Sequence, residues 1–178
     1  MEMKGFNIRY TAIDLAYLGV VAAVSGVIFA LTWEVYYIGE LIGGPIGARI
    51  LSYGLWFIGA PLAATLIKKP LSAFLGETLG ALVETIIPTY GGFTNLIYGV
   101  SQGLFSELVY LLFRYRRFDS LTATLAGAVA GIPAVYLDTL LFEEIYPLEV
   151  MFLILIGAMI SGGIYGFLSS LAVKAVKH

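Results

Sequence analysis

Long apolar runs are the feature that most constrains the fold of this chain. Charged residues or Pro and Gly bound six of them, at residues 13–33, 46–67, 70–87, 95–113, 121–142 and 148–173. A helix needs roughly 20 residues to cross a hydrocarbon core about 30 Å thick. Only 12% of the residues are charged, about half the share in soluble domains. The sequence therefore predicts an all-α polytopic membrane protein with six transmembrane helices.

Other architectures do not fit these runs. They are too long for the strands of an outer-membrane barrel and lack its alternating pattern, and open sheet edges cannot exist in lipid. The first run exceeds the apolar segment of a secretory signal, and no cleavage pattern leads into a polar chain. With no internal repeat or linker, residues 1–178 are predicted to form one transmembrane domain.

The basic residues predict the orientation. Nine of the ten fall on one side of the six-span arrangement: Lys4, Arg9, Lys68, Lys69, Arg114, Arg116, Arg117, Lys174 and Lys177. Arg49 is the exception. The opposite side carries Glu34, Glu40, Glu143, Glu144 and Glu149. By the positive-inside rule both termini are expected in the cytoplasm, and a five- or seven-span count would scramble this asymmetry.

Several chemistries are excluded by the residues that the chain contains. It has no Cys, and its only His is the last residue, His178, which argues against metal centres and imidazole catalysis. The stretch 99–103 matches the hydrolase pattern G-x-S-x-G but lies in an apolar run with no His to activate the serine. No phosphate-binding G-x-x-x-x-G-K-[ST] motif is present. Scattered Lys and Arg form no nucleic-acid patch. We therefore expect no catalytic residues, cofactor or metal, and any ATP drive must come from a partner.

Four acids lie inside the predicted spans: Glu77, Glu84, Glu107 and Asp138. No Lys or Arg lies deep in any span to neutralise them. An ionised acid at a helix centre costs roughly 2.5–3.5 kcal/mol on insertion scales, so each acid either is protonated or hydrogen-bonded in an interhelical tie or receives a cation. Glu77 and Glu84 are two turns apart and share one helix face. Glu84, Gln102 and Asp138 fall in the outer half of the membrane, whereas Glu107 lies deeper and fits a tie.

Aromatic side chains gather toward the same outer side. Tyr53, Trp56 and Phe57 are spaced to share one helix face, where they could stack a planar ring or hold a cation, or simply pack in the core. Trp33, Tyr36 and Tyr37 are interpreted as an interfacial aromatic belt. The longest outer loop, residues 34–45, is rich in Gly and is either a lid over an outward-facing pocket or a mere connection.

One whole face of the helix predicted for the first run carries only small side chains. Ala12, Ala16, Gly19, Ala23, Gly26 and Ala30 follow one another at intervals of three or four residues. Such a face favours close packing against another helix, either within the chain or in a second protein. The last run has a shorter version at Ala158, Gly162, Gly166 and Ser170.

A motif string in the middle of the chain resembles a known family. Residues 69–84 read K-P-x2-A-x3-E-x3-A-x2-E, preceded by G-L-W-F-I at 54–58 and followed by G-x2-Q-G-x3-E at 99–107. The combination is similar to the YkoE-type S component of energy-coupling-factor (ECF) transporters over residues 44–114, with Asp138 as a weaker continuation. The chain departs from the family's K-P-G-A opening at Leu71-Ser72, and it has Ile87-Pro88 where a glycine-rich stretch is common.

The resemblance implies a six-helix protein of a prokaryotic plasma membrane that captures thiamine, or its hydroxymethylpyrimidine precursor, from outside. It further implies association with a transmembrane coupling subunit and two cytoplasmic ATPases, with the small face at Ala12, Ala16, Gly19 and Ala23 toward the coupling subunit. Thiamine needs aromatic planes, a carboxyl or amide for its pyrimidine edge, and negative charge. The expected site residues are Glu84, Glu77, Gln102, Tyr53, Trp56 and Asp138, Glu84 first. The main alternative is a proton-coupled transporter or antiporter for a cationic solute, using Glu77, Glu84 and Glu107 as a relay; a third is an assembly subunit without a ligand.

Overall fold

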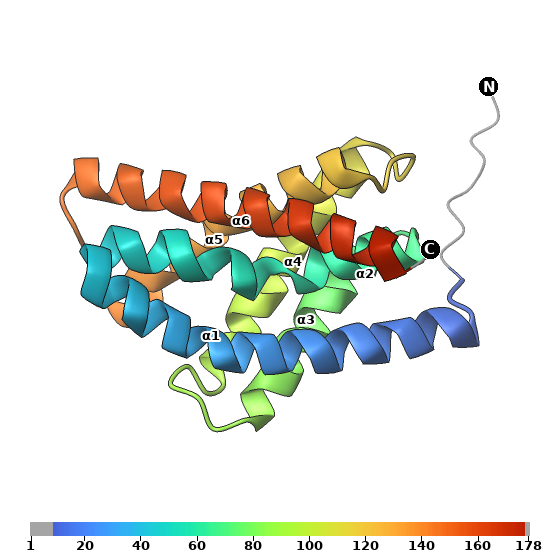
Figure 1. Cartoon of the computed structure of the whole chain (residues 1–178), viewed down its shortest axis with the longest axis horizontal. Helices are drawn as coiled ribbons and strands as arrows, with labels where there is room; N and C mark the ends of the chain where they lie inside the picture. The colour runs from blue at the N-terminus through green and yellow to red at the C-terminus, as the bar shows by residue number, and fades with distance from the viewer. Residues whose placement is uncertain (1–8, 177–178) are drawn as a thin grey trace.

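The structure, a computed structural model, describes residues 9–176, and within them it is all-helical (Figure 1). Lys4, Lys177 and His178, used in the sequence analysis, lie outside these residues. The elements in chain order are α1 (Ala12–Ser52), the short 3-10 helix η1 (Tyr53–Phe57), α2 (Gly59–Ile67), α3 (Ser72–Ile86), α4 (Thr94–Leu112), α5 (Ser120–Phe142) and α6 (Leu148–Val176).

Helix α1 is two antiparallel arms joined by a glycine turn. The helical backbone is broken at Gly43 and Gly44, and the φ of +58° and ψ of −152° at Gly44 belong to a region that only glycine adopts readily. Pro45 then begins the second arm, where a proline at the first helical position costs no hydrogen bond. Figure 1 shows the first arm (blue) turning at the left into the second (cyan). A Cβ on Gly39 would lie 2.8 Å from the carbonyl oxygen of Gly47, so the arms touch backbone to backbone.

This hairpin corrects the expectation of an outer loop over residues 34–45. The first arm stays helical up to the turn at Gly43, well past the predicted end of the first span at residue 33. The connection between the two arms is therefore two residues long. The stretch is helical where it borders the cavity described below, whose lining includes Tyr36, Tyr37 and Glu40.

The second apolar run, expected as one span over residues 46–67, is interrupted. The second arm of α1 gives way to the 3-10 helix η1, and α2 starts only at Gly59. A 3-10 helix has three residues per turn, so Tyr53 and Trp56 stay on one face whereas Phe57 is turned away from the face that α-helical spacing predicts for all three. Mid-helix 3-10 geometry of this kind often marks a functional hinge or a sequence under strain.

The remaining four runs form helices close to the predicted bounds. Asp119 caps α5 through a reciprocal pair of hydrogen bonds with Thr122, as Thr11 caps α1 with Asp14. Helix α5 packs along α6, and α3 packs along α4 and α1. The small face of α6 is part of the contact with α5: a Cβ on Gly131 would lie 3.0 Å from the backbone of Ala158. That face therefore has a partner within the chain.

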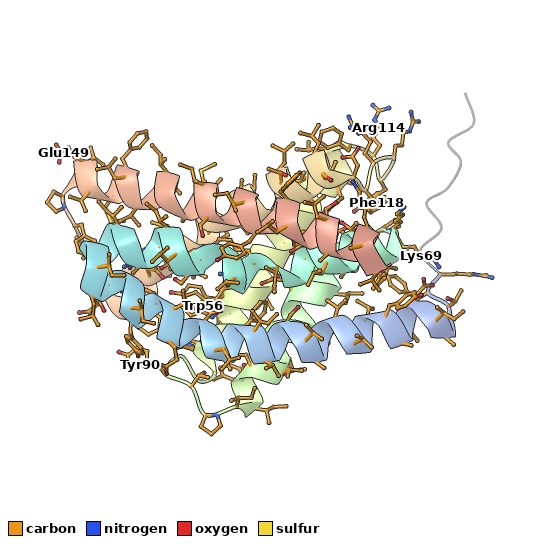
Figure 2. The ribbon with its side chains drawn as sticks, viewed as in Figure 1. Trp56, Lys69, Tyr90, Arg114, Phe118 and Glu149 are labelled. Atoms are coloured by element: carbon orange, nitrogen blue, oxygen red, sulfur yellow. The ribbon has the colours of Figure 1, made fainter. Side chains whose placement is uncertain are left out.

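The outer surface is apolar, as a lipid environment requires. Along α1 and α6, large side chains remain exposed, among them Ile13, Val20, Val24, Val27, Leu31, Ile160, Ile164 and Leu168. Three stretches of the described chain are long and apolar enough to cross a membrane: 12–67, 120–142 and 148–176. In Figure 2, Lys69 and Arg114 lie toward one end of the bundle and Glu149 lies at the other, so charge is segregated along the helices.

Candidate functional site

A cavity of about 350 Å³ lies among the first arm of α1, η1, and helices α3, α4 and α5. Its lining is dominated by aromatic rings and carboxyl groups: Phe29, Trp33, Tyr36, Tyr37, Glu40, Tyr53, Trp56, Phe57, Ala81, Glu84, Tyr90, Asn95, Tyr98, Gly99, Gln102, Ala134, Asp138, Phe142 and Glu144. Five of the six predicted substrate-binding residues, namely Glu84, Gln102, Tyr53, Trp56 and Asp138, are in this lining. The volume suits a small organic molecule.

Glu84 forms one wall of the cavity from the last turns of α3. Its side chain is nearly buried, with 3% of the residue exposed, and its Oε1 accepts a hydrogen bond from the Trp33 indole at 3.1 Å. The Trp56 indole donates to the carbonyl oxygen of Phe29 at 3.0 Å, and the rings of Trp33 and Trp56 meet edge to face with centroids 4.9 Å apart. Two indoles from different elements are thus held beside one carboxyl group (Trp56 is labelled in Figure 2).

The opposite wall is built around Asp138 of α5. Its Oδ1 accepts a hydrogen bond from the Tyr98 hydroxyl at 2.8 Å, and its Oδ2 accepts one from the Tyr53 hydroxyl. A nitrogen of the Arg49 guanidinium lies 3.6 Å from Oδ2, and the same guanidinium forms an ion pair with Glu144. The expectation that no basic residue neutralises the buried acids is therefore wrong for Asp138. The tight turn of α1 brings Arg49, near the start of its run, against the C-terminal end of α5.

Glu77, the sixth predicted site residue, is not part of the cavity lining. Its side chain is fully buried between α2 and α3, and Oε2 accepts a hydrogen bond from the backbone N–H of Ala60 at 2.8 Å. Ala60 lies in the first turn of α2, where N–H groups lack partners within the helix. A Cβ on Gly59 would lie 2.9 Å from the Gly76 carbonyl oxygen, so α2 and α3 are in close contact there. Glu77 thus caps α2 directly below η1.

We expect Glu77→Leu to destabilise the protein by about 1–3 kcal/mol, because the Ala60 N–H would be left buried without an acceptor. Glu77→Gln retains an amide oxygen as acceptor and should lose much less. Thermal unfolding in detergent compares the two variants. Equal stability of the Leu and Gln variants would show that the Ala60 hydrogen bond does not hold the start of α2.

Glu107 lies at the other end of α3 from Glu84. Its Oε1 accepts from the backbone N–H of Leu71 at 2.6 Å and its Oε2 from that of Phe74 at 3.0 Å, so the carboxylate caps the first turn of α3. A carboxylate of α4 thereby ties α3 to α4. The geometry is that of the interhelical tie considered from the sequence.

The small face of the first run divides into an open part and a packed part. Ala12, Ala16, Gly19 and Ala23 are exposed, and no atom lies within 4 Å of a Cβ built on Gly19. Gly26 is instead packed on α3, where a Cβ would lie 2.5 Å from Val83. Four small residues of the first arm are thus left uncovered by the described chain.

Sequence reasoning assigned three lining residues to another role. Trp33, Tyr36 and Tyr37 were interpreted as a membrane-interface belt, yet all three line the cavity and Trp33 bonds to Glu84. Their spacing of i, i+3 and i+4 repeats that of Tyr53, Trp56 and Phe57, and this repetition was a usable signal. Arg49 could have been found as the lone basic residue on the acidic side. Nothing local indicated Glu40 or Glu144.

Comparison with known proteins places this geometry in a family. The sequence profile described as "ABC-type cobalt transport system, permease component" matches residues 13–133. "Putative HMP/thiamine permease protein YkoE" of Bacillus subtilis (strain 168) is 30% identical over 122 residues. That alignment covers 67% of this chain and 61% of the relative, so the chain spans less than two thirds of the relative's length in the match.

A solved structure supports the same assignment. "Crystal structure of an S-component of ECF transporter" superposes with a TM-score of 0.83 at 27% identity, covering 94% of this chain and 84% of that one. These relatives are named as transport proteins, and the described part of this chain has helices apolar enough to cross a membrane. This chain is a multi-pass protein of a prokaryotic membrane. The predicted resemblance to the YkoE-type S components is thereby confirmed. The chain belongs to the permease-component family of ABC-type cobalt transport systems and has the S-component fold of ECF transporters.

Proposed function

We propose that this protein is the substrate-capture subunit of an ECF-type transporter and that it binds thiamine from outside the cell for ATP-driven uptake. The observation that carries this proposal is the cavity itself, in which aromatic rings surround buried carboxyl groups. The name of the Bacillus subtilis relative, which refers to HMP and thiamine, supports the same substrate class. The protein is proposed to bind its substrate without chemical change.

The two walls of the cavity suit the two parts of thiamine. An aminopyrimidine can lie against the indoles of Trp33 and Trp56 and donate a hydrogen bond from its amino group to Glu84, while Gln102 offers amide donors and an acceptor. The thiazolium ring carries a permanent positive charge, which carboxylates and aromatic faces attract. Four acidic side chains line the cavity, Glu40, Glu84, Asp138 and Glu144. They favour thiamine over its hydroxymethylpyrimidine precursor, which is neutral.

Cobalt, named in the family description, fits the cavity less well. Aromatic rings supply most of the lining, and both oxygens of Asp138 already accept hydrogen bonds from tyrosines. Imidazole and thiolate groups, which bind late transition metals well, are not among the lining residues. The donor chemistry therefore supports an organic cation.

We propose six membrane spans with both termini in the cytoplasm. The two arms of α1, with η1 and α2 continuing the second, supply two crossings, and α3 to α6 supply the other four. The segregation of Lys69 and Arg114 from Glu149 supports this orientation, because basic residues favour the cytoplasmic side. The cavity would then lie in the outer half of a single domain over residues 1–178.

The exposed part of the first arm is proposed to contact the transmembrane coupling subunit. Ala12, Ala16, Gly19 and Ala23 allow close approach of a partner helix within the bilayer. Two cytoplasmic ATPases would then supply the energy, since the chain has no phosphate-binding loop motif of its own.

A titration of the purified protein with thiamine and with hydroxymethylpyrimidine tests the proposal. We expect tight binding of thiamine, weaker binding of the precursor, and no accumulation of either in vesicles that contain this protein alone. Accumulation driven by a proton gradient would instead support the alternative of a proton-coupled transporter or antiporter, in which Glu77, Glu84 and Glu107 would act as a relay. Binding of neither compound would refute the proposed substrate class.

A further inference from the structure

Arg49 is a buried cation placed directly behind the cavity. It lies in the second arm of α1, is 1% exposed, and does not itself belong to the lining. Its guanidinium lies 3.6 Å from Asp138 and pairs with Glu144, and it donates to the Tyr36 hydroxyl at 3.1 Å. These three partners all line the cavity. One layer of side chains therefore separates the charge of Arg49 from the space that the substrate would occupy.

Two aromatic rings enclose the guanidinium. Its central carbon lies 5.4 Å from the centroid of the Tyr36 ring and 5.5 Å from that of the Tyr53 ring, and both rings line the cavity. A further hydrogen bond runs to the carbonyl oxygen of Pro45 at 3.3 Å. A charge held in this way is shielded from bulk water, so its field is screened less than that of a surface arginine.

The charges around the cavity are unequal. Four carboxyl groups line it, and Arg49 is the basic side chain in contact with two of them, Asp138 and Glu144. Glu84, on the opposite wall, accepts its hydrogen bond from a neutral indole. Arg49 thus offsets part of the negative charge on one wall and leaves the Glu84 wall unaltered.

We propose that Arg49 is a specificity-determining residue, whose buried positive charge sets how strongly the cavity prefers a cationic ligand over a neutral one of the same pyrimidine class. This inference rests on the proposed function and deepens it. A ligand cation is attracted by the four carboxylates and repelled by Arg49, whereas a neutral pyrimidine responds little to either. Removing the Arg49 charge should therefore strengthen cation binding relative to neutral binding.

The expected change in this preference is about tenfold, which corresponds to about 1.4 kcal/mol. Two unit charges roughly 10 Å apart at an effective dielectric constant of about 20 interact by an energy of that size. The measured quantity is the ratio of the dissociation constant of hydroxymethylpyrimidine to that of thiamine, obtained by calorimetric titration of the full chain. General damage to the cavity would weaken both ligands and leave this ratio unchanged.

Four variants test the sign of the effect. Arg49→Gln should raise the ratio about tenfold, Glu144→Gln should lower it, and the double variant should return it toward the wild-type value because the charges removed cancel. Arg49→Lys retains the charge and should keep the wild-type ratio. Arg117→Gln is the matched control, since Arg117 is an exposed arginine paired with Asp119 before the start of α5.

If Arg49→Gln does not fold, the comparison of Glu144→Gln with the double variant measures the same charge, because the double variant removes one positive and one negative charge together and Asp138 keeps its two tyrosine hydrogen bonds. A ratio that stays within about twofold of wild type in Arg49→Gln, or between those two variants, would overturn the proposal. So would a raised ratio in Arg49→Lys. Binding of neither ligand by the wild type would refute the proposed function itself, which is a distinct outcome.

Discussion

Replacing Glu84 with Gln is expected to weaken thiamine binding by about 10- to 150-fold. The substitution keeps the side-chain volume but removes the charge and one acceptor from the wall that carries Trp33 and Trp56. A hydrogen bond to a charged group contributes roughly 1.5–3 kcal/mol, which gives this range. The stability of the empty protein should hardly fall, since a neutral amide is easier to bury than an anion and Gln can still accept from the Trp33 indole. Direct titration with thiamine measures the effect.

Glu107→Gln is the matched control for this experiment. The substitution is chemically identical, but Glu107 caps the opposite end of α3 through the N–H groups of Leu71 and Phe74. We expect it to lower stability while changing thiamine affinity much less than Glu84→Gln. Equal binding of thiamine by the wild type and by Glu84→Gln would show that Glu84 does not bind the ligand. A larger loss of affinity in Glu107→Gln would show that Glu107, and not Glu84, binds the ligand.

Replacing Ala16 or Ala23 with Trp is expected to abolish uptake by the assembled transporter while leaving thiamine binding intact. Both side chains are exposed on the first arm of α1, and an indole there would hold a partner helix away from the backbone. The cavity lies among other faces and elements, so its contacts are unchanged. Uptake of labelled thiamine into cells that also express the coupling subunit and the ATPases measures the loss, and titration of the isolated variants measures binding.

Val24→Trp provides the control for added bulk. Val24 is also exposed on the first arm but is turned about 100° around the helix axis from Ala23, so its indole should face lipid and leave uptake near wild type. Normal uptake in both Ala16→Trp and Ala23→Trp would show that this face is not the docking surface. Loss of binding in those variants would mean that they disturb the cavity as well.

The helical class of the protein followed from its sequence because lipid leaves few alternatives. Runs of about 20 apolar residues must satisfy their backbone groups internally, so they form helices wherever they occur. For the last four runs, the charged, Pro and Gly residues that bound them also predicted the ends within a few residues. Five cavity residues could be identified too, because acids and an amide inside apolar runs are costly unless they are paired or bind a ligand, and aromatic rings are predicted on the same side of the membrane.

The hairpin within α1 and the break in the second run were decided by tertiary structure. A glycine-rich stretch is compatible with a loop or with a single turn, and only the contact between Gly39 and Gly47 selects the turn. The same holds for η1 and α2, whose junction is stabilised by Glu77 from a helix that comes later in the chain. Local propensity contains no term for such contacts.

The roles of the buried acids were separated only by their partners in space. Glu77, Glu84, Glu107 and Asp138 look alike in sequence, since each is a carboxyl group in an apolar run. Folding gives backbone N–H groups to Glu77 and Glu107, an indole to Glu84, and two tyrosines with Arg49 to Asp138. The sequence by itself therefore determined that a helical membrane bundle would bury these charges. Tertiary structure alone decided which acids became helix caps and which line the cavity, because the environment of a carboxyl group is set by the residues that folding brings to it.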